Sequence, residues 1–320
     1  MNQDIFVTIE HLRGNLAEIS YIMLAAAHEL AQGTGGKVVA ILLGQNAQGM
    51  ADTLKADQVM YGDHSLLAEF NPEAYQNVLA SIISEHQPRA VLFGHTSLGM
   101  DIVGGISAQL GLPEVSSVRT IEANNKLICQ ICGGKIMAEC ELPEPTALMT
   151  VMPGGYKAED GQSTQAASIT TIAVDLPESL HMSLNQYIEP EAGDVDISKE
   201  PLLIAVGRGI QTGDNISIAE DLAEAIGGVV CASRPVVDQG WLPTSRLVGK
   251  SGSTVKPKIY LAMGISGAPE HVEAITESDT IIAINTDPAA PIFNIAKYGT
   301  TADLFDLVPI LTDQIKELKG

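Results

Sequence analysis

The feature that most constrains the fold is an alternation of short apolar runs with longer amphipathic segments. Across the first third of the chain, runs rich in Val, Ile and Leu alternate with segments whose apolar residues recur at helical spacing. The expected strands are 4–10, 37–44, 56–62 and 89–95, and the expected helices are 15–32, 72–87 and 101–113. Because strands joined through helices pair in parallel, this alternation predicts a parallel sheet flanked by helices. Apolar residues make up 45% and aromatic residues 4% of the chain, which suits helices packed on buried parallel strands.

The pattern changes between about residues 114 and 175. Apolar runs follow one another there with glycine and proline between them, and no helical segment separates them. These runs are 126–134, 135–143, 146–155 and 167–176. Successive strands joined by turns pair antiparallel, so we expect an antiparallel edge or flap in this region.

Cys129 and Cys132 form a C-x-x-C pair in this region, with Cys140 nearby. A zinc site needs a second ligand pair, and a thioredoxin-like motif places its cysteines at the start of a helix. Residues three apart on a strand point to opposite faces, so packing is the favoured role and no metal site is expected. Cys231 lies in an apolar run and is interpreted as a small core residue.

Residues 183–200 are polar and contain Pro190 and Gly193, which indicates a linker. A second alternation of strand and helix patterns follows it. Its expected strands are 201–207, 229–233, 258–264 and 279–285, and its expected helices are 215–228, a short one around 270, and 302–318. A chain of 320 residues exceeds what one hydrophobic core usually organises. We therefore expect two α/β domains, 1–190 and 191–320, each with a mainly parallel sheet flanked by helices.

Charge and hydropathy exclude two classes of partner. The formal net charge is −21, so the chain offers no basic face to neutralise the phosphates of a nucleic acid. No run approaches the roughly 20 apolar residues of a membrane span, and the N-terminal residues lack the pattern of a targeting signal. Four cysteines in a chain of this length do not make a disulfide framework. A cytoplasmic protein is expected, or one of the mitochondrial matrix in a eukaryote.

Two glycine-containing loops follow apolar runs. The stretch "GRGIQTGDN", 207–215, suits a phosphate at a helix N-terminus, but its glycines are one residue off the dinucleotide pattern, so an ordinary turn remains an equal alternative. The stretch "MGISGAPEH", 263–271, resembles a serine-hydrolase loop, yet Ala268 stands where that motif needs glycine. His271 is also the last histidine, too close to Ser266 for a triad. A glycine-rich loop at the end of a strand instead suits ligand binding by an open α/β sheet.

Arg234 directly follows a predicted buried strand, in "ASRPVVDQGW". A guanidinium at the end of a parallel strand can stabilise an anion or stack on a planar ring. An ordinary surface ion pair is the alternative interpretation.

These segments have a recognisable order. "VGRGI", "AEDLAEAIGG", "SRPVVDQGWLP", "VGKSGSTVKPKIYLAMGISGAPEH" and "TIIAINTDPAAPIFNIAKYGTTADLFDLVP" resemble the α subunit of electron transfer flavoprotein in order and spacing. The resemblance is nearly continuous over 200–312, whereas the N-terminal half is similar in layout only, with "VLFGHTSLGMDIVGGISAQLGLP" and "TVMPGGY" each similar to a stretch of the family.

The resemblance implies a redox electron carrier rather than a substrate-turnover enzyme. It implies a doubly wound FAD-binding domain, and a heterodimer in which the N-terminal domain pairs with a β subunit. The flavin would take electrons from dehydrogenases, those of fatty acid β-oxidation among them, and pass them to a membrane quinone oxidoreductase or another acceptor. Some members bifurcate electrons from NADH. A nucleotide-binding structural subunit without redox activity and a stand-alone nicotinamide oxidoreductase are the competing interpretations.

The resemblance also implies a set of cofactor-binding residues. It assigns flavin tuning to Arg234, Ser251 and His271: the arginine lies over the isoalloxazine, the hydroxyl near N5 and the histidine at O2. The implied set is Arg208, Ser233, Arg234, Val248, Gly249, Lys250, Ser251, Ser266, Gly267, Ala268, Pro269, Glu270, His271, Asn285, Asp303 and Leu304.

This chain departs from the family pattern at several of these positions. Lys250 stands for glutamine, Ser251 for threonine, and Pro269 and Glu270 for isoleucine and glutamine, while Lys297 replaces an acidic residue. A carboxylate at Glu270 disfavours an anionic flavin unless Lys250 offsets its charge, so we interpret the two exchanges as compensating.

Overall fold

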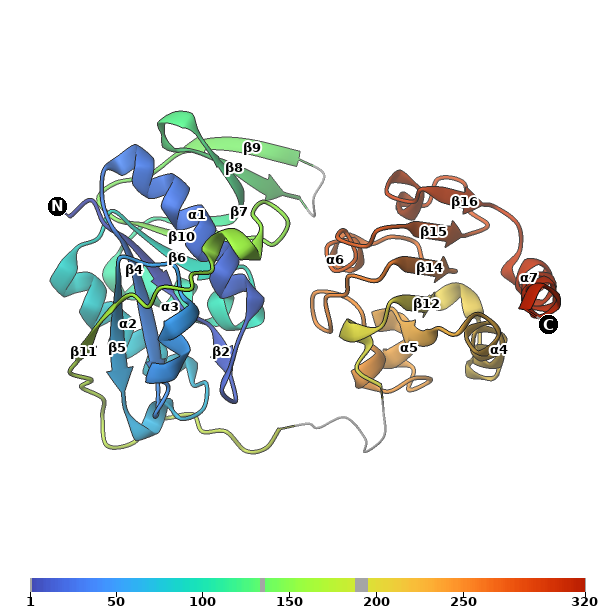
Figure 1. The fold of residues 1–320 in the computed structure, drawn as a ribbon, viewed down its shortest axis with the longest axis horizontal. Helices are drawn as coiled ribbons and strands as arrows, with labels where there is room; N and C mark the ends of the chain where they lie inside the picture. Colours follow the sequence, from blue (N-terminus) through green and yellow to red (C-terminus); the bar gives the residue numbers. More distant parts are fainter. Residues whose placement is uncertain (1, 133–135, 188–194, 320) are drawn as a thin grey trace. The chain divides into compact units, whose positions relative to one another are not determined.

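The computed structural model describes residues 2–132, 136–187 and 195–319 (Figure 1). The chain divides into two compact units, residues 1–187 and 188–320. Of the predicted linker, 183–200, the part that contains Pro190 and Gly193 lies outside the described residues.

The N-terminal unit is built on a nine-stranded sheet of the described residues, in the order β11-β5-β4-β1-β6-β10-β7-β8-β9. Neighbours from β11 to β7 run parallel, and β7, β8 and β9 are antiparallel. The strands are β1 Ile5–Thr8, β4 Val38–Gly44, β5 Gln58–Asp63, β6 Ala90–Gly94, β7 Glu114–Glu122, β8 Lys126–Ile131, β9 Ile136–Glu141, β10 Ala147–Val151 and β11 Ser168–Ile172. A separate small hairpin joins β2, His11–Leu12, to β3, Asn15–Leu16.

Helices cover both faces of this sheet. They are α1 Glu18–Thr34, α2 Pro72–His86 and α3 Ser97–Leu110. Successive side chains of β1 point to opposite faces of the sheet. Ile5 and Val7 therefore pack in the core under α1, and Phe6 packs in the core under α2 and α3. The predicted parallel sheet flanked by helices is therefore confirmed.

The predicted antiparallel flap is correct for the runs that contain β8 and β9 and wrong for the two later runs, and β7, which pairs with β8, was not among the predicted runs. The run 146–155 contains β10, which lies between β6 and β7 and is parallel to both. The run 167–176 contains β11, which pairs in parallel with β5 at the other edge of the sheet. All five residues of β10 are buried, as expected of a strand covered on both faces, and turn signals alone do not reveal that position.

The cysteine pair behaves as packing residues. Cys129 on β8 is buried, whereas Cys132 is exposed. The Cys129 Sγ lies 4.0 Å from the Cys140 Sγ on β9, and burial raises the pKa of Cys129 to about 12. No group of three His, Cys, Asp or Glu side chains that could hold a metal ion occurs in the described ranges.

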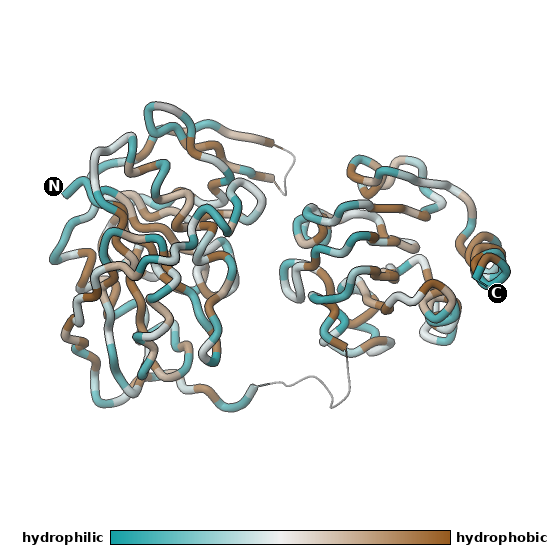
Figure 2. Tube along the Cα trace, viewed as in Figure 1, coloured by the Kyte–Doolittle hydropathy of each residue, from teal (hydrophilic) through white to brown (hydrophobic). Residues whose placement is uncertain are grey.

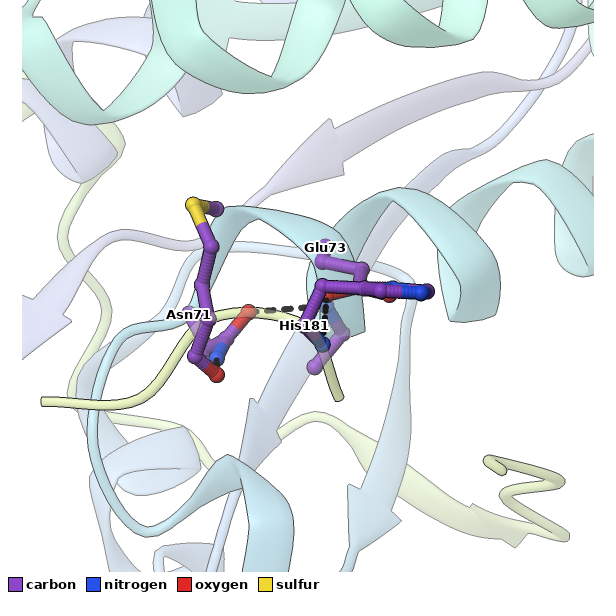
Figure 3. Close-up of polar contacts among 5 residues, drawn as sticks. Asn71, Glu73 and His181 are labelled. Carbon is purple, nitrogen blue, oxygen red and sulfur yellow. Dashed lines mark hydrogen bonds and ion pairs between the residues drawn. The ribbon is translucent and has the colours of Figure 1, made fainter. Parts of the chain in front are cut away.

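Residues 181–182, close to the end of the N-terminal unit, are hydrogen-bonded to the N-cap and first turn of α2 (Figure 3). Two groups of His181 meet the Glu73 carboxylate: the backbone N–H and Nδ1, each at 2.7 Å. The Asn71 side chain donates to the Met182 carbonyl at 2.8 Å, and its Oδ1 accepts the Ala74 N–H, which caps α2.

Among its described residues, the C-terminal unit contains a five-stranded parallel sheet in the order β13-β12-β14-β15-β16 (Figure 1). Hydrophobic residues, brown in Figure 2, follow its strands. Its strands are β12 Leu202–Val206, β13 Val229–Ala232, β14 Ile259–Met263, β15 Ile281–Ile284 and β16 Tyr298–Thr300. Its helices are α4 Ile216–Ile226, α5 Arg234–Asp238, α6 Pro269–Val272 and α7 Leu304–Lys319. The order reverses between β12 and β14, because β13 lies on one side of β12 and the later strands lie on the other. The doubly wound sheet and the short helix around 270 are confirmed, and β16 was not predicted.

Candidate functional site

The candidate residues gather where the strands of the C-terminal sheet end, which we call its carboxyl edge. Each strand is followed by at least one of them: β12 by Arg208, β13 by Ser233 and Arg234, β14 by Ser266, β15 by Asn285, and β16 by Asp303. Because the strands are parallel, these positions share one edge of the sheet. Open α/β sheets bind ligands at this edge, beside the point where the strand order reverses.

At that point the loops after β12 and β14 cross with their backbones in contact. The Gly209 N–H donates to the Gly264 carbonyl at 3.0 Å, and Gly264 has a φ of +64°. A Cβ added at Gly209 would lie 2.7 Å from the Gly264 Cα, and one at Gly207 would lie 2.3 Å from the Gly264 carbonyl oxygen. A side chain at either position would collide with the other loop, so only glycine lets the two backbones cross this closely.

A cavity of about 210 Å³ opens beside the glycine crossing. Its lining includes Gly209, Gly264, Asn285, Asp303 and Leu304. The Asn285 side chain donates to the Ile265 carbonyl at 2.9 Å, which ties the loop after β15 to the loop after β14. The Asp303 carboxylate accepts the Phe305 N–H at 2.9 Å at the start of α7. These side chains thus position the wall of the cavity.

A second group of residues centres on Arg234, the first residue of α5. Its Nη1 donates to the Ser251 Oγ at 3.1 Å, and its Nε lies 3.4 Å from the Asp238 carboxylate. Its side chain is 65% exposed, so the guanidinium is accessible to a ligand while Ser251 and Asp238 orient it. The ligand-facing and ion-pair interpretations of Arg234 are therefore compatible.

The loops 248–251 and 266–271 are joined to each other beside this group. The Lys250 N–H donates to the Glu270 carbonyl at 2.9 Å. The Gly249 φ of +147° suits glycine, and Gly267 has a φ of +85°. The Ser266 carbonyl accepts the Ile292 N–H at 3.0 Å, which holds the second loop against the segment after β15.

His271 is buried between these loops, with only 6% of its surface exposed. Its Nδ1 lies 3.1 Å from the Val248 carbonyl, and its Nε2 lies 2.8 Å from the Tyr260 hydroxyl. Burial lowers the pKa of His271 to about 4, so the ring is neutral at physiological pH.

Two models of known domains match this chain. The electron transfer flavoprotein domain matches residues 5–177, and the electron transfer flavoprotein FAD-binding domain matches residues 196–276. The electron transfer flavoprotein subunit alpha of Thermoanaerobacterium thermosaccharolyticum is 35% identical, with 99% of each chain covered. The chain belongs to the electron transfer flavoprotein α-subunit family.

Other relatives agree with this assignment. The electron transfer flavoprotein subunit alpha of Bacillus subtilis is 31% identical and covers 99% of both chains. The acryloyl-CoA reductase electron transfer subunit beta of Anaerotignum propionicum is 36% identical, covering 99% of this chain and 97% of the relative. The protein is accordingly an FAD-binding electron transfer flavoprotein subunit.

The donor set of the site fits such a cofactor. A cavity of about 210 Å³ lies beside the glycine crossing, and the exposed Arg234 supplies a cation that can lie against a planar ring. Ser251 accepts a hydrogen bond from Arg234, which leaves its own O–H to donate. In the described part of the chain, no helix combines the length and the apolar character needed to cross a membrane.

Sequence reasoning missed several neighbours of the site, of which Tyr260 is buried. Tyr260 contacts His271, and Gln211, Thr286 and Phe305 line the cavity. The signal for Tyr260 was a single hydroxyl within the otherwise apolar run of β14. Tyrosine is common in apolar runs, and only its contact with His271 distinguishes this one.

Proposed function

We propose that the chain is the FAD-carrying subunit of a heterodimer with an electron transfer flavoprotein β subunit. In this proposal the flavin lies along the carboxyl edge of the C-terminal sheet. It takes electrons from dehydrogenases and passes them to a quinone oxidoreductase or another acceptor. A place in fatty acid β-oxidation or in a bifurcating complex belongs to the same proposal.

The observation that carries the proposal is the contact between Arg234 and Ser251 at this edge. The cofactor supplies the reversible uptake of electrons. A fixed cation beside it favours the form that carries more negative charge, and this raises the reduction potential without any covalent step. Because Ser251 and Asp238 hold the guanidinium, little reorganisation is needed when that charge develops.

In this proposal the other residues of the set bind the cofactor and orient it. The pyrophosphate lies against the loop after β12, where Arg208 and Gly209 are exposed. The loops 248–251 and 266–271 are held together by the bond between Lys250 and Glu270, so they can enclose the ring as one wall. Asn285 and Asp303 form the cavity on the adenosine side.

The test is titration of FAD into the full chain co-purified with its β subunit, for wild type and Arg234→Ala. We expect a stoichiometric flavin spectrum in wild type. In the variant we expect a lower midpoint potential, because the cation is gone, with FAD affinity reduced about tenfold if roughly 1.4 kcal/mol of binding is lost.

Lys258→Ala is the matched control, because Lys258 is an exposed cation at the opposite end of β14. It should leave both quantities as in wild type. A complex that takes up no FAD would support the structural-subunit interpretation. Turnover of NAD(P)H by the isolated chain would support the nicotinamide oxidoreductase instead.

A further inference from the structure

Tyr260 is the largest fully buried side chain in the described part of the chain. It is the second residue of β14, and the residues that follow it on the strand, Leu261, Ala262 and Met263, are apolar and buried. A hydroxyl removed from water in such a place requires hydrogen-bond partners.

The partners of Tyr260 determine where the hydrogens lie. The Val248 carbonyl can only accept, so the His271 Nδ1 that lies 3.1 Å from it carries the hydrogen. In a neutral ring the other nitrogen, Nε2, then has a lone pair. The Tyr260 hydroxyl, 2.8 Å away, therefore donates to it.

Cys231 on β13 is fully buried in the same core cluster as Tyr260. Burial raises the pKa of the Cys231 thiol to about 12, so the sulfur keeps its hydrogen and adds no charge beside Tyr260. The donors Tyr260 and His271 each have an acceptor, the His271 Nε2 and the Val248 carbonyl.

We propose that Tyr260 is a positioning residue for the cofactor site, which holds His271 as a neutral ring with its hydrogen on Nδ1. The ring adds no positive charge to the site, and its single N–H is bound to Val248. A flavin oxygen that faces His271 must compete with the Val248 carbonyl for that hydrogen. The consequence for the flavin rests on the proposed function, whereas the tautomer does not.

The tautomer can be measured without any cofactor. In the full-length apo chain with ¹⁵N-labelled histidine, two-bond ¹⁵N–¹H correlation spectra distinguish the Nδ1–H form, the Nε2–H form and the imidazolium. At neutral pH we expect His271 to be in the Nδ1–H form. In Tyr260→Phe, the Nε2 lone pair loses its donor, so we expect its resonance to shift and a second protonation form to be populated.

Tyr298→Phe is the matched control, because Tyr298 is 59% exposed on β16 of the same unit. It should leave the His271 signals unchanged. An imidazolium or Nε2–H ring in wild type overturns the proposal, and so do identical His271 spectra in wild type and Tyr260→Phe.

If Tyr260→Phe does not fold, two substitutions at His271 test whether the hydrogen lies on the Nδ1 side of the ring. Asparagine places an amide near the Nδ1 position, where it can donate to Val248, whereas glutamine reaches the Nε2 position. We expect slower hydrogen exchange at the Lys250 amide, which bonds to Glu270, in His271→Asn than in His271→Gln. The reverse order contradicts the proposal.

The cofactor consequence has its own measurement. In FAD-loaded complexes, Tyr260→Phe should raise the flavin midpoint potential, because the ring can then be protonated beside it. If the flavin potential is unchanged while the His271 tautomer is altered, only the proposed influence of Tyr260 on the flavin is refuted. If the chain binds no FAD, the proposed function fails and the tautomer result still stands.

Discussion

Both units contain parallel strands whose order reverses beside the first strand of the unit, and different residues occupy the two reversal points. In the N-terminal unit the reversal lies between β1 and β6, and Glu10 fills it. In the C-terminal unit it lies between β12 and β14, where glycines cross and a cavity of about 210 Å³ opens beside them. The same topology thus gives a closed position in one unit and an open one in the other.

The carboxylate of Glu10 is enclosed by the chain itself. Each of its oxygens lies 2.9 Å from the Thr96 Oγ1, which accepts the Gly99 N–H and so caps α3. A Cβ added at Gly94 would lie 2.4 Å from the Glu10 Oε1. Glu10 therefore occupies the helix N-terminus where a doubly wound sheet usually receives the anionic group of a ligand. Topology permits a site there, and individual side chains decide whether it is open.

Filling the glycine crossing should disturb both the fold of the C-terminal unit and its FAD binding. Gly209→Ala places a Cβ 2.7 Å from the Gly264 backbone, so one loop has to move. We expect a loss of roughly 1–3 kcal/mol, seen as weaker FAD binding or a lower melting temperature of the C-terminal unit. Gly104→Ala in α3 of the other unit is the control, since nothing lies within 4 Å of its added Cβ. Equal behaviour of the two variants would contradict this account of the crossing.

The closed position should make the N-terminal unit sensitive to pH. Burial raises the pKa of Glu10 from 4.5 to about 7. The folded state therefore binds a proton more tightly than the unfolded state. The resulting stabilisation is complete below pH 4.5 and is lost as the pH rises through 7. Its size is on the order of 3 kcal/mol.

Hydrogen exchange of the β1 and α1 amides between pH 5 and 8 measures this effect, after correction for intrinsic exchange rates. The sequence has one tryptophan, Trp241, so fluorescence reports on the C-terminal unit and not on this one. Glu10→Gln should remove the Glu10 contribution to the pH dependence, whereas Glu85→Gln, at an exposed position of α2, should retain it. A pH profile that is the same in Glu10→Gln and wild type contradicts the assignment.

The exposed pair of His181 and Glu73 should give the smallest effect. Each group favours the charged form of the other, so the pKa of His181 is raised and that of Glu73 is lowered. The contact is weakened as the pH rises through the His181 pKa, and again as it falls through the Glu73 pKa. Because the pair is exposed, salt should screen it, unlike the buried Glu10.

Exchange of the His181 amide, which donates to Glu73, measures this pair. We expect faster exchange in Glu73→Gln and, in wild type, at high salt. Glu178→Gln, at an exposed neighbouring acid, is the control and should match wild type. Insensitivity of the wild-type amide to salt would show that the contact is not electrostatic.

The sequence by itself determined most of the main elements and the edge at which the candidate residues meet. Apolar periodicity located β4, α2 and α4 to within a few residues, because each buries a regular face. Helical crossovers implied parallel strands, so residues that follow different strands, such as Arg234 and Asn285, had to lie at one edge. That rule connects distant parts of the chain without any knowledge of side-chain packing.

Only the tertiary structure decided what surrounds each side chain. It placed β10 between β6 and β7, and it brought Thr96 to Glu10 across 86 positions of sequence. It also gave His271 two protein partners, Tyr260 and Val248. Burial and hydrogen bonding set the protonation of Glu10 and His271, and both depend on neighbours that are distant in sequence. A local pattern does not contain those neighbours, so the charge of these groups could be read only from the folded chain.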